Sequence, residues 1–356
     1  MKILHWVGLT PNACGLYEQA KDQIAAERSV GIDSQAIDFR IVDNKEIFGE
    51  IKTDEWLTSV GLDWTKEADI NVIHSGINEK YKSKKPNILM MHGRPEYAFM
   101  LAYLKNKTSM YQEYMSYRWD ERYRKFITMW PEHKFMWDMV FPKHKMECIP
   151  LLLDTNTYNL TGKIFDLNTP SSKRAEFNIL VADMWREDVT PYNVIVAAAK
   201  FVKEECPEAR IHIVGMGQFN NPALQGFLGI LKDNDVLGAC AGVCAEVDQF
   251  YRACDIMVSP QVICTRSVRE ATACGLIVVG GAGATWTDYK ANPLDTDGYA
   301  KEIKRAYDAW KEKKDTIKLE QYEKAKKLWS PKVAGLALKK VYEEILEDIK
   351  SRPYLT

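Results

Sequence analysis

The chain has 356 residues, which at about 150 residues per domain predicts two domains. Its residues are 46% apolar and 27% charged, so each half can bury a core. The 48 basic and 49 acidic residues give a net charge of -1, which excludes a strongly basic protein that binds nucleic acid with its whole surface. No stretch is long and apolar enough for a signal peptide or a membrane span, so we expect a soluble, cytoplasmic protein.

The cysteines do not form a metal-binding or disulfide pattern. Eight are scattered along the chain, and the closest pair, Cys240 and Cys244, has neither the spacing nor the second pair of a zinc site. We therefore expect reduced, mostly buried thiols and no bound metal.

The first half alternates short apolar runs with helical patterns. The predicted elements are a strand over 2–7, a turn-rich loop over 8–15, a helix over 16–29 that ends at Gly31, and strands over 35–39, 69–74 and 86–92. The last two strands end in His74 and His92. Such alternation predicts a parallel sheet whose loops gather at the carboxyl ends of the strands, where open α/β sheets bind ligands.

Residues 103–145 differ from the rest of the first half. Nine Lys or Arg and five Asp or Glu give this segment a charge of about +4, and eleven residues are aromatic, in stretches compatible with long helices. Aromatic rings interleaved with Arg and Lys are typical of surfaces that stack bases and contact phosphates. Amphipathic helices with an aromatic core face, or an interface for a glycolipid, would have the same pattern. These three interpretations stay open.

The second half repeats the alternation of strands and helices. Strands are predicted over 177–182, 209–214, 255–259 and 276–279, and helices over 191–204, 247–253 and 268–274. Ser330 and Pro331 predict the start of a last long helix. The resulting domains are 1–150, a linker over 151–176, a second domain over 177–330 and a final helix over 331–356.

Motifs in the second half occur in a recognisable order. They are Trp185-Arg186 with Pro191-Tyr192, Gly215-Met-Gly217, Tyr251-Arg-Ala-Cys-Asp255 running to Pro260, and Glu270-Ala-Thr-Ala-Cys-Gly275 running to Val279. This order resembles the retaining glycosyltransferases of the family 4 type, which have the GT-B fold. In the first half Gly15-Leu-Tyr-Glu18, His92-Gly93 and Ile149–Thr155 with Tyr158 resemble that family more loosely.

The resemblance implies an α/β protein with two Rossmann-like domains that face each other across a cleft, and a C-terminal helix that crosses back to the first domain. It implies transfer of a sugar with retention from a nucleoside-diphosphate sugar, a UDP-sugar as our choice, without a cofactor. Arg186 and Arg266 would hold the diphosphate, Glu270 would accept hydrogen bonds from the ribose, and His92 would serve the acceptor side. Gly15, Gly215 and Gly217 would let the backbone approach the donor.

Two departures from the family pattern limit the analogy. Val262 stands where the family has a first Glu, and Pro191 where it has a Lys. Either the donor site is rebuilt, or the chain is a catalytically silent module that binds sugar nucleotides. A nucleotide-sugar epimerase of the same fold is a further alternative. An NAD-dependent oxidoreductase is disfavoured because Gly215-Met-Gly217 lacks the third glycine of that fingerprint.

Phage α-glucosyltransferases that modify hydroxymethylcytosine in DNA also lack the first Glu, and the chain resembles them in this respect. A hydroxymethylated pyrimidine in DNA, bound through residues 103–145, is therefore the preferred acceptor, with a glycan or a lipid as the alternative. The plainer interpretations are that Glu270 and Arg186 are surface charges and that His92 and His74 are structural histidines at strand ends.

Overall fold

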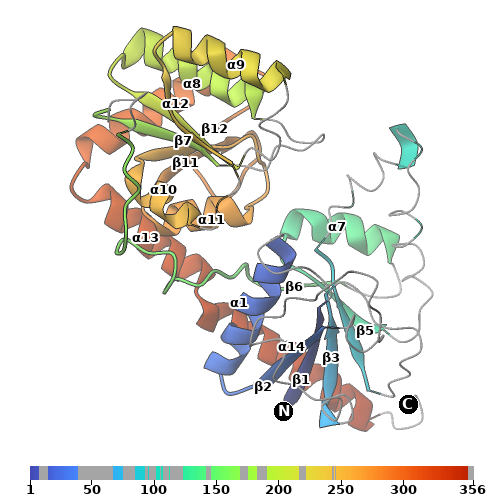
Figure 1. The fold of residues 1–356 in the computed structure, drawn as a ribbon. Coiled ribbons are helices and arrows are strands. Elements are labelled where there is room, and N and C mark those ends of the chain that lie inside the picture. Colours follow the sequence, from blue (N-terminus) through green and yellow to red (C-terminus); the bar gives the residue numbers. More distant parts are fainter. Residues whose placement is uncertain are drawn as a thin grey trace. The chain divides into compact units, whose positions relative to one another are not determined.

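The structure is a computed structural model that describes residues 1–7, 15–38, 67–74, 85–92, 95, 102–104, 106, 112, 123–141, 146–168, 175–182, 191–215, 222–242, 244 and 246–351. The chain divides into two compact units, which Figure 1 shows as a ribbon. The first unit combines Met1–Leu152 with Leu328–Thr356, and the second is Leu153–Lys327.

The first unit is built on a six-stranded sheet in which every pair of neighbouring strands is parallel. The strand order is β2-β1-β3-β4-β5-β6. The strands are β1 (Lys2–Val7), β2 (Asp33–Asp38), β3 (Ile70–Ile73), β4 (Asn87–Met90), β5 (Tyr123–Thr128) and β6 (Met146–Cys148). The predicted strands over 2–7, 35–39, 69–74 and 86–92 are therefore confirmed, with shifts of one or two residues at their ends.

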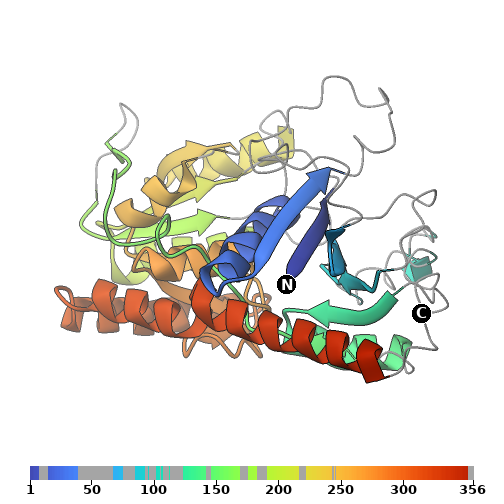
Figure 2. The ribbon, with the colours of Figure 1, turned by 90° about the horizontal axis from the view of Figure 1, so that it is seen from below.

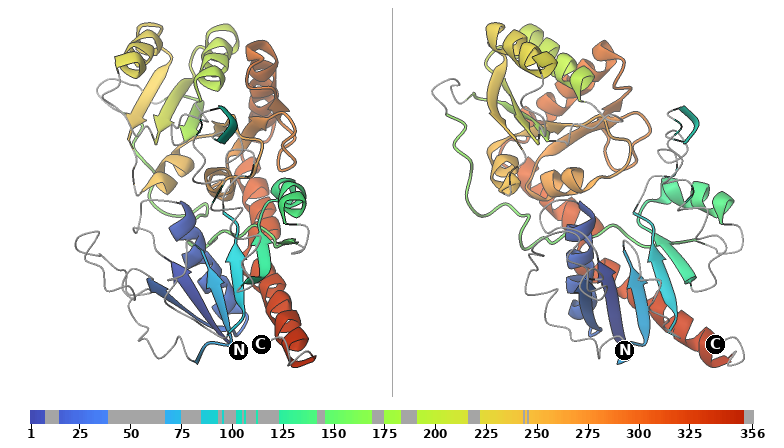
Figure 3. Two further views of the ribbon diagram at one scale, coloured as in Figure 1. Left: turned by 90° about the vertical axis from the view of Figure 1, so that its right-hand side faces the viewer. Right: turned by 45° about the vertical axis from the view of Figure 1, so that its right-hand side comes forward.

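Helices cover both faces of this sheet. Helix α1 (Gly15–Ser29) lies beside α14 (Pro331–Ser351) on one face, as Figure 3 shows in blue and red, and α7 (Pro131–Val140) packs on the other. The two helices of the first face approach closely because position 335 is glycine: a Cβ atom there would lie 2.5 Å from the carbonyl oxygen of Ala26. The last helix, prominent in Figure 2, thus joins the first unit as expected.

Within the segment 103–145, where long helices were expected, residues 123–128 form a strand, so the expectation is wrong for this stretch; residues 105, 107–111, 113–122 and 142–145 lie outside the described residues. Tyr123–Thr128 forms β5, which lies between β4 and β6, and the only long helix among the described residues of this segment is α7. Apolar and aromatic side chains of β5 pack in the core, while Lys125 pairs with Glu147 of β6 at 2.7 Å. Pairing and burial in the sheet override a local pattern that is also compatible with a helix.

The second unit holds a second six-stranded parallel sheet of order β12-β11-β10-β7-β8-β9. Read from β9, this is the order of the Rossmann fold. The strands are β7 (Asn178–Ala182), β8 (Arg210–Val214), β9 (Leu237–Ala241), β10 (Ile256–Val258), β11 (Ile277–Gly281) and β12 (Lys290–Ala291). The sequence patterns predicted β7, β8, β10 and β11, and missed β9 and β12.

Helices also cover both faces of the second sheet. They are α8 (Tyr192–Glu205), α9 (Pro222–Asp233), α10 (Val247–Ala253), α11 (Arg266–Ala273), α12 (Thr296–Glu312) and α13 (Ile317–Trp329). Side chains of α8, α9 and α12 share one apolar core with the sheet, and Figure 1 shows α10 and α11 on the opposite side. The predicted two-domain α/β architecture is confirmed. Among the described helices, none combines the length and the apolar character that a membrane crossing requires.

Candidate functional site

The strand order of the second sheet reverses between β7 and β10. In open parallel sheets, ligands bind beyond the carboxyl ends of the strands at such a reversal. Arg266 and Glu270 lie on α11, the helix that follows β10, and Gly215 directly follows β8, the neighbour of β7. Arg186 follows β7 but lies outside the described residues, as does Gly217. Among the described residues, the topology therefore brings Gly215, Arg266 and Glu270 to one edge of one sheet.

Glu270 is a buried carboxylate, not a solvent-facing one. Glu270 is 5% exposed, and its Oε1 accepts a hydrogen bond from Nε of Arg266 at 2.6 Å. Its Oε2 accepts a hydrogen bond from the hydroxyl of Tyr251 at 3.2 Å. A carboxylate has about four acceptor positions on its two oxygens, so these two contacts, together with a hydrogen bond from Tyr158, leave room for about one ribose hydroxyl.

Burial controls the protonation of this carboxylate. Burial raises the pKa of Glu270 above its ordinary value, and the charge of Arg266 with the hydrogen bonds of Tyr158 and Arg266 opposes that rise. The hydroxyl of Tyr158 faces the same pair, and burial raises its pKa as well. The Arg266 guanidinium also lies 5.8 Å from the ring centroid of Tyr158. The site thus combines one buried anion with a cation and two phenol groups.

Tyr158 and Tyr251 were not predicted as site residues, although both belong to the motifs that carry the resemblance. Tyr251 precedes β10 on α10, and Tyr158 follows the segment 149–155. Sequence spacing could have found the pair of Arg266 and Glu270, because residues four apart on a helix lie on the same face. It could not have found the tyrosines, which come from other elements.

The position of the missing family Glu is occupied by a half-exposed apolar side chain. Val262 is 40% exposed, and its carbonyl oxygen accepts a hydrogen bond from Nε1 of Trp286 at 2.7 Å. The loop packs against the end of β11, where a Cβ atom on Gly281 would lie 2.8 Å from the carbonyl oxygen of Pro260. The backbone of this loop is therefore held in place, while its side chain at 262 offers no hydrogen bond.

Gly215 has a conformation that favours glycine. Its φ is +95°, in the left-handed region, and its amide contacts the carbonyl oxygens of Ala241 and Gly242 at 3.2 and 3.1 Å. A side chain at this position would strain the turn after β8. This agrees with the predicted role of Gly215 as a point of close backbone approach, which stays a prediction.

A buried arginine ties the linker to α10. Arg252 is 8% exposed and donates hydrogen bonds to the carbonyl oxygens of Thr157, Asn159 and Lys163 at 3.0, 3.0 and 3.1 Å. Asp248 of the same helix pairs with its guanidinium. Because Tyr158 lies in this linker segment, Arg252 also helps to hold Tyr158 beside Glu270.

In the first sheet the strand order reverses between β1 and β3, and the predicted site residues Gly15 and His92 follow β1 and β4, the latter being the neighbour of β3. Gly15 begins α1, the helix after β1, while His74 follows β3 and His92 follows β4. Gly93 lies outside the described residues. His92 is partly exposed, whereas His74 is 4% exposed.

His92 does not stand alone, because a line of hydrogen bonds runs from it into the core. Nε2 of His92 lies 3.0 Å from Nδ1 of His74, and Nε2 of His74 lies 2.8 Å from Nδ1 of His5. Nε2 of His5 lies 2.8 Å from Oε2 of Glu27, which is fully buried. Glu27 and His5 were not predicted, and His74 was interpreted as structural.

The protonation equilibria in this line differ from those of exposed groups. Burial lowers the pKa of His92 to about 4 and that of His74 well below its ordinary value. Burial alone would raise the pKa of Glu27, but the attraction of His5 and the hydrogen bonds from His5, Ser34 and Tyr342 bring it below its ordinary value. The line therefore ends inside the protein at an ionised carboxylate.

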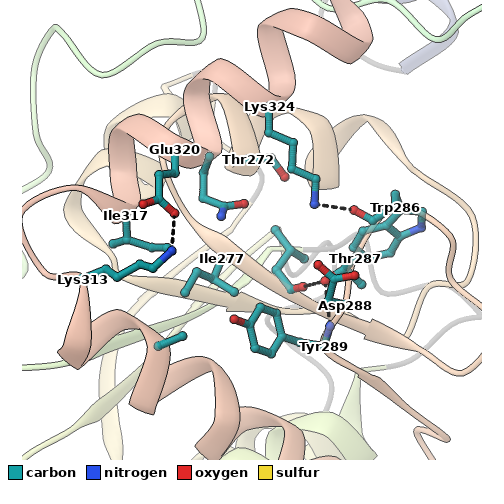
Figure 4. Close-up of a pocket in the computed structure, with 13 residues that line it drawn as sticks. Thr272, Ile277, Trp286, Thr287, Asp288, Tyr289, Lys313, Ile317, Glu320 and Lys324 are labelled. Atoms are coloured by element: carbon teal, nitrogen blue, oxygen red, sulfur yellow. Dashed lines mark hydrogen bonds and ion pairs between the residues drawn. The ribbon is translucent and has the colours of Figure 1, made fainter.

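A separate cavity of about 370 Å³ lies in the second unit, and Figure 4 shows its lining. Both lysines of its lining have partners there: Lys313 pairs with Glu320 at 2.9 Å, and Nζ of Lys324 donates to the carbonyl oxygen of Trp286 at 2.9 Å. None of the predicted site residues lines it. We assign it no part in the proposed reaction.

The described residues contain no group of three or more His, Cys, Asp or Glu that could hold a metal ion. The described cysteines are free thiols. Burial raises the pKa of Cys274 to about 12, so this thiol is hardly ionised at neutral pH.

The chain was compared with protein-family models and with solved structures. Residues 178–308 match the family model described as Glycosyl transferases group 1. Sucrose-phosphate synthase from Thermosynechococcus elongatus is similar with a TM-score of 0.69 and 12% identity, over 98% of this chain and 100% of that one. HepE from Anabaena, solved with UDP-glucose, is similar with a TM-score of 0.63 and 15% identity, over 97% of this chain and 100% of that one.

The pneumococcal O-GlcNAc transferase GtfA, solved with UDP and GlcNAc, is similar with a TM-score of 0.62 and 13% identity, over 97% of this chain and 99% of that one. None of the curated protein sequences matches the chain. At such low identities the likeness shows the fold, and the expected GT-B fold class is confirmed.

Proposed function

We propose that the protein is a glycosyltransferase that moves a sugar with retention from a nucleoside-diphosphate sugar to a hydroxyl acceptor. The observation that carries this proposal is the meeting of Glu270 and Arg266 at the switch point of the second sheet, inside the segment that matches the glycosyl transferases group 1 family. Two of the similar structures were solved with UDP-glucose or with UDP and GlcNAc, which supports a UDP-sugar donor.

Binding of the sugar nucleotide needs a cation for the diphosphate, an acceptor for the hydrogen bonds of the ribose hydroxyls, and a backbone segment that can come close to the nucleotide. Arg266 stands at the first residue of α11, where the helix N-terminus adds to its positive potential. Glu270 accepts hydrogen bonds from the ribose, and Gly215 allows the backbone to approach. Arg186 supplies a second cation, from a segment that the structure does not describe. These groups stabilise the charge that develops on the diphosphate as it leaves.

In our proposal the transfer proceeds on one face of the sugar. The leaving phosphate takes the proton of the attacking hydroxyl, so no protein nucleophile is needed. Arg186 and Arg266 keep the diphosphate in place, and His92 binds the acceptor side. The absence of the family carboxylate at Val262 means that the sugar hydroxyls must find other partners.

For the acceptor, we propose a hydroxymethylated pyrimidine in DNA, and a glycan or lipid hydroxyl as the alternative. Support comes from the charge of residues 103–145, of which Arg124 is exposed. Tyr123 and Trp137 do not add to this support, because they are core residues, 3% and 0% exposed, and cannot stack on bases. Lys125 and Lys134 are each paired with a carboxylate, which weakens their contribution to phosphate binding.

A transfer assay tests the function directly. The full chain is incubated with radiolabelled UDP- and GDP-sugars, alone and with DNA that contains hydroxymethylated pyrimidines. Release of sugar from one donor in wild-type protein, and its loss in Glu270→Ala, would support the proposal. Tight binding of a sugar nucleotide without hydrolysis or transfer would instead identify a catalytically silent module. Epimerised donor without transfer would identify an epimerase.

A further inference from the structure

The line of hydrogen bonds behind His92 follows the pleat of the first sheet. His5 lies on β1 opposite Val72 of β3, which in turn lies opposite Ile88 of β4. His74 is two residues beyond Val72, and His92 is four residues beyond Ile88. Each histidine is thus one strand over and two residues nearer the carboxyl edge than the one before. Since side chains alternate between faces, all three lie on the face that α1 and α14 cover.

At the inner end, the carboxylate of Glu27 is surrounded by donors. Its Oε1 accepts hydrogen bonds from the hydroxyl of Tyr342 at 2.6 Å and from Nε2 of Gln23 at 3.1 Å. Its Oε2 accepts one from the hydroxyl of Ser34 in addition to its contact with His5. An ionised carboxylate only accepts, so the partners confirm that Nε2 of His5 carries a proton and donates it.

The position of the proton on His5 determines which nitrogens donate and accept in the next two histidines. A neutral imidazole has one N–H donor and one acceptor nitrogen, so in the form of the line in which His5 is neutral, Nδ1 of His5 accepts a hydrogen bond and Nε2 of His74 donates it. By the same rule Nδ1 of His74 accepts and Nε2 of His92 donates. The remaining nitrogen, Nδ1 of His92, is then an acceptor, and none of the described residues forms a hydrogen bond with it.

We propose that Glu27, acting through His5 and His74, keeps the proton of His92 on Nε2 and so makes Nδ1 of His92 an acceptor that selects a substrate hydroxyl. The second part of this statement rests on the proposed function. Glu27, His5 and His74 are positioning residues in this scheme. They act on the substrate only through His92, which lies at the edge of the sheet.

The alternative form of the line has a protonated His5 beside the ionised Glu27. Both ring nitrogens of His5 would then donate, every hydrogen bond of the line would run the other way, and Nδ1 of His92 would be a donor. The described groups that hydrogen-bond to Glu27 from the elements packed around it are Gln23 of α1, His5 of β1, Ser34 of β2 and Tyr342 of α14.

The tautomers can be measured without any substrate. Long-range proton–nitrogen correlation spectra of the full chain labelled with ¹⁵N report which ring nitrogen of each histidine is protonated. At neutral pH we expect His5, His74 and His92 each to be protonated on Nε2 only. Protonation of His92 on Nδ1, or a fast mixture of both forms, would overturn the proposal whether or not the protein transfers a sugar.

Variants test whether Glu27 sets the tautomer of His92 through His5 and His74. His74→Phe keeps a ring in the sheet but removes both nitrogens, and we expect His92 to change from one tautomer to a mixture. Tyr342→Phe is the matched control, because it removes one donor to Glu27 and keeps the negative charge; His92 should stay protonated on Nε2. His212 in the second unit is an internal control for folding, since Asn178 and the amide of Ala239 hold its two nitrogens at 3.0 and 2.9 Å. An unchanged His92 in His74→Phe would overturn the proposal.

A kinetic measurement tests the link to the hydroxyl. Loss of one neutral hydrogen bond in His92→Phe should raise the KM for the acceptor about two- to tenfold with a smaller effect on the KM for the donor. Because the tautomers are measured separately, an unchanged acceptor KM would remove the hydroxyl from the proposal and leave the tautomer result standing. Absence of any transfer in the wild-type protein would instead count against the proposed function.

Discussion

Nε of Arg266 lies 2.6 Å from Oε1 of Glu270, one helical turn further along α11. A cation that suits a diphosphate and an anion that suits a ribose are thus joined before any ligand arrives. Their pairing holds both side chains in one geometry, which reduces the entropy that nucleotide binding must overcome. It also means that a change in either residue alters the other.

Substitution of Glu270 should weaken nucleotide binding. In Glu270→Ala the ribose loses its acceptor, and Arg266 keeps a charge without its partner carboxylate. We expect a loss of about 1.5–3 kcal/mol in the binding free energy of UDP or GDP, the range for hydrogen bonds to a charged group. Isothermal titration calorimetry measures it. Glu320→Ala, which breaks the exposed pair with Lys313 in the same unit, is the control and should bind as the wild type does. Equal affinities for Glu270→Ala and wild type would remove the assignment.

Activity should survive removal of divalent metal ions. In our scheme Arg186, Arg266 and helix N-termini neutralise the diphosphate, so a metal is not required. Initial rates of donor hydrolysis with and without EDTA should agree. Turnover that returns only after Mg²⁺ or Mn²⁺ is added would contradict this assignment of the cations.

The free energy of unfolding should fall as the pH is lowered from about 6.5 to about 4. Burial lowers the pKa of His92 and of His212 to about 4. Between about pH 4 and 6.5 these histidines therefore bind protons in the unfolded chain but stay neutral in the folded protein. Each histidine can contribute up to about 1.4 kcal/mol per pH unit there. Urea titrations at several pH values measure the slope. His92→Gln should make it shallower by about one proton, and an unchanged slope would show that His92 titrates normally.

Loss of Arg252 should destabilise the second unit. Arg252→Met leaves three carbonyl oxygens of the linker and the carboxylate of Asp248 without their shared donor. Since removal of one partner from a buried charged pair costs about 3–5 kcal/mol, we expect a loss of that order in unfolding free energy. Arg305→Met is the matched control: Arg305 pairs with Glu302 on the surface, its side chain is 57% exposed, and its loss should have little effect. Similar thermal midpoints for the two variants would refute the anchoring role.

Binding to DNA, if residues 103–145 provide it, should weaken as the salt concentration rises. Each phosphate contact on duplex DNA contributes about -0.9 to the slope of log affinity against log salt, and about three to five contacts are expected from the local charge. Reversal of Arg122 and Arg124 to Glu should remove about two contacts and leave free-nucleotide binding unchanged. Filter binding at two salt concentrations decides this. No binding at low salt and no sugar transfer to hydroxymethylated DNA would leave a glycan or a lipid as the acceptor.

Local sequence patterns were sufficient for much of the fold. The strand over 2–7, the helix end at Gly31 with its φ of +81°, and the start of the last helix after Ser330 were all predicted. These features depend on short-range chemistry: alternation or runs of apolar residues, a glycine that tolerates a left-handed turn, and a proline in the first turn of a helix. The grouping of Glu270 with Arg266 depends on spacing along a single helix and is equally local.

Other features were decided by contacts that local patterns do not contain. Tyr123–Thr128 is a strand because it lies between β4 and β6, although its own residues are compatible with a helix. Glu27 meets His5 across 22 residues and Tyr342 across 315 residues, so only the packing of α1 against β1 and α14 brings them together. The sequence by itself determined which segments form strands and helices in most places, because that choice follows from local periodicity. The tertiary structure alone decided which buried groups form hydrogen bonds with one another, because that depends on strand register and helix packing.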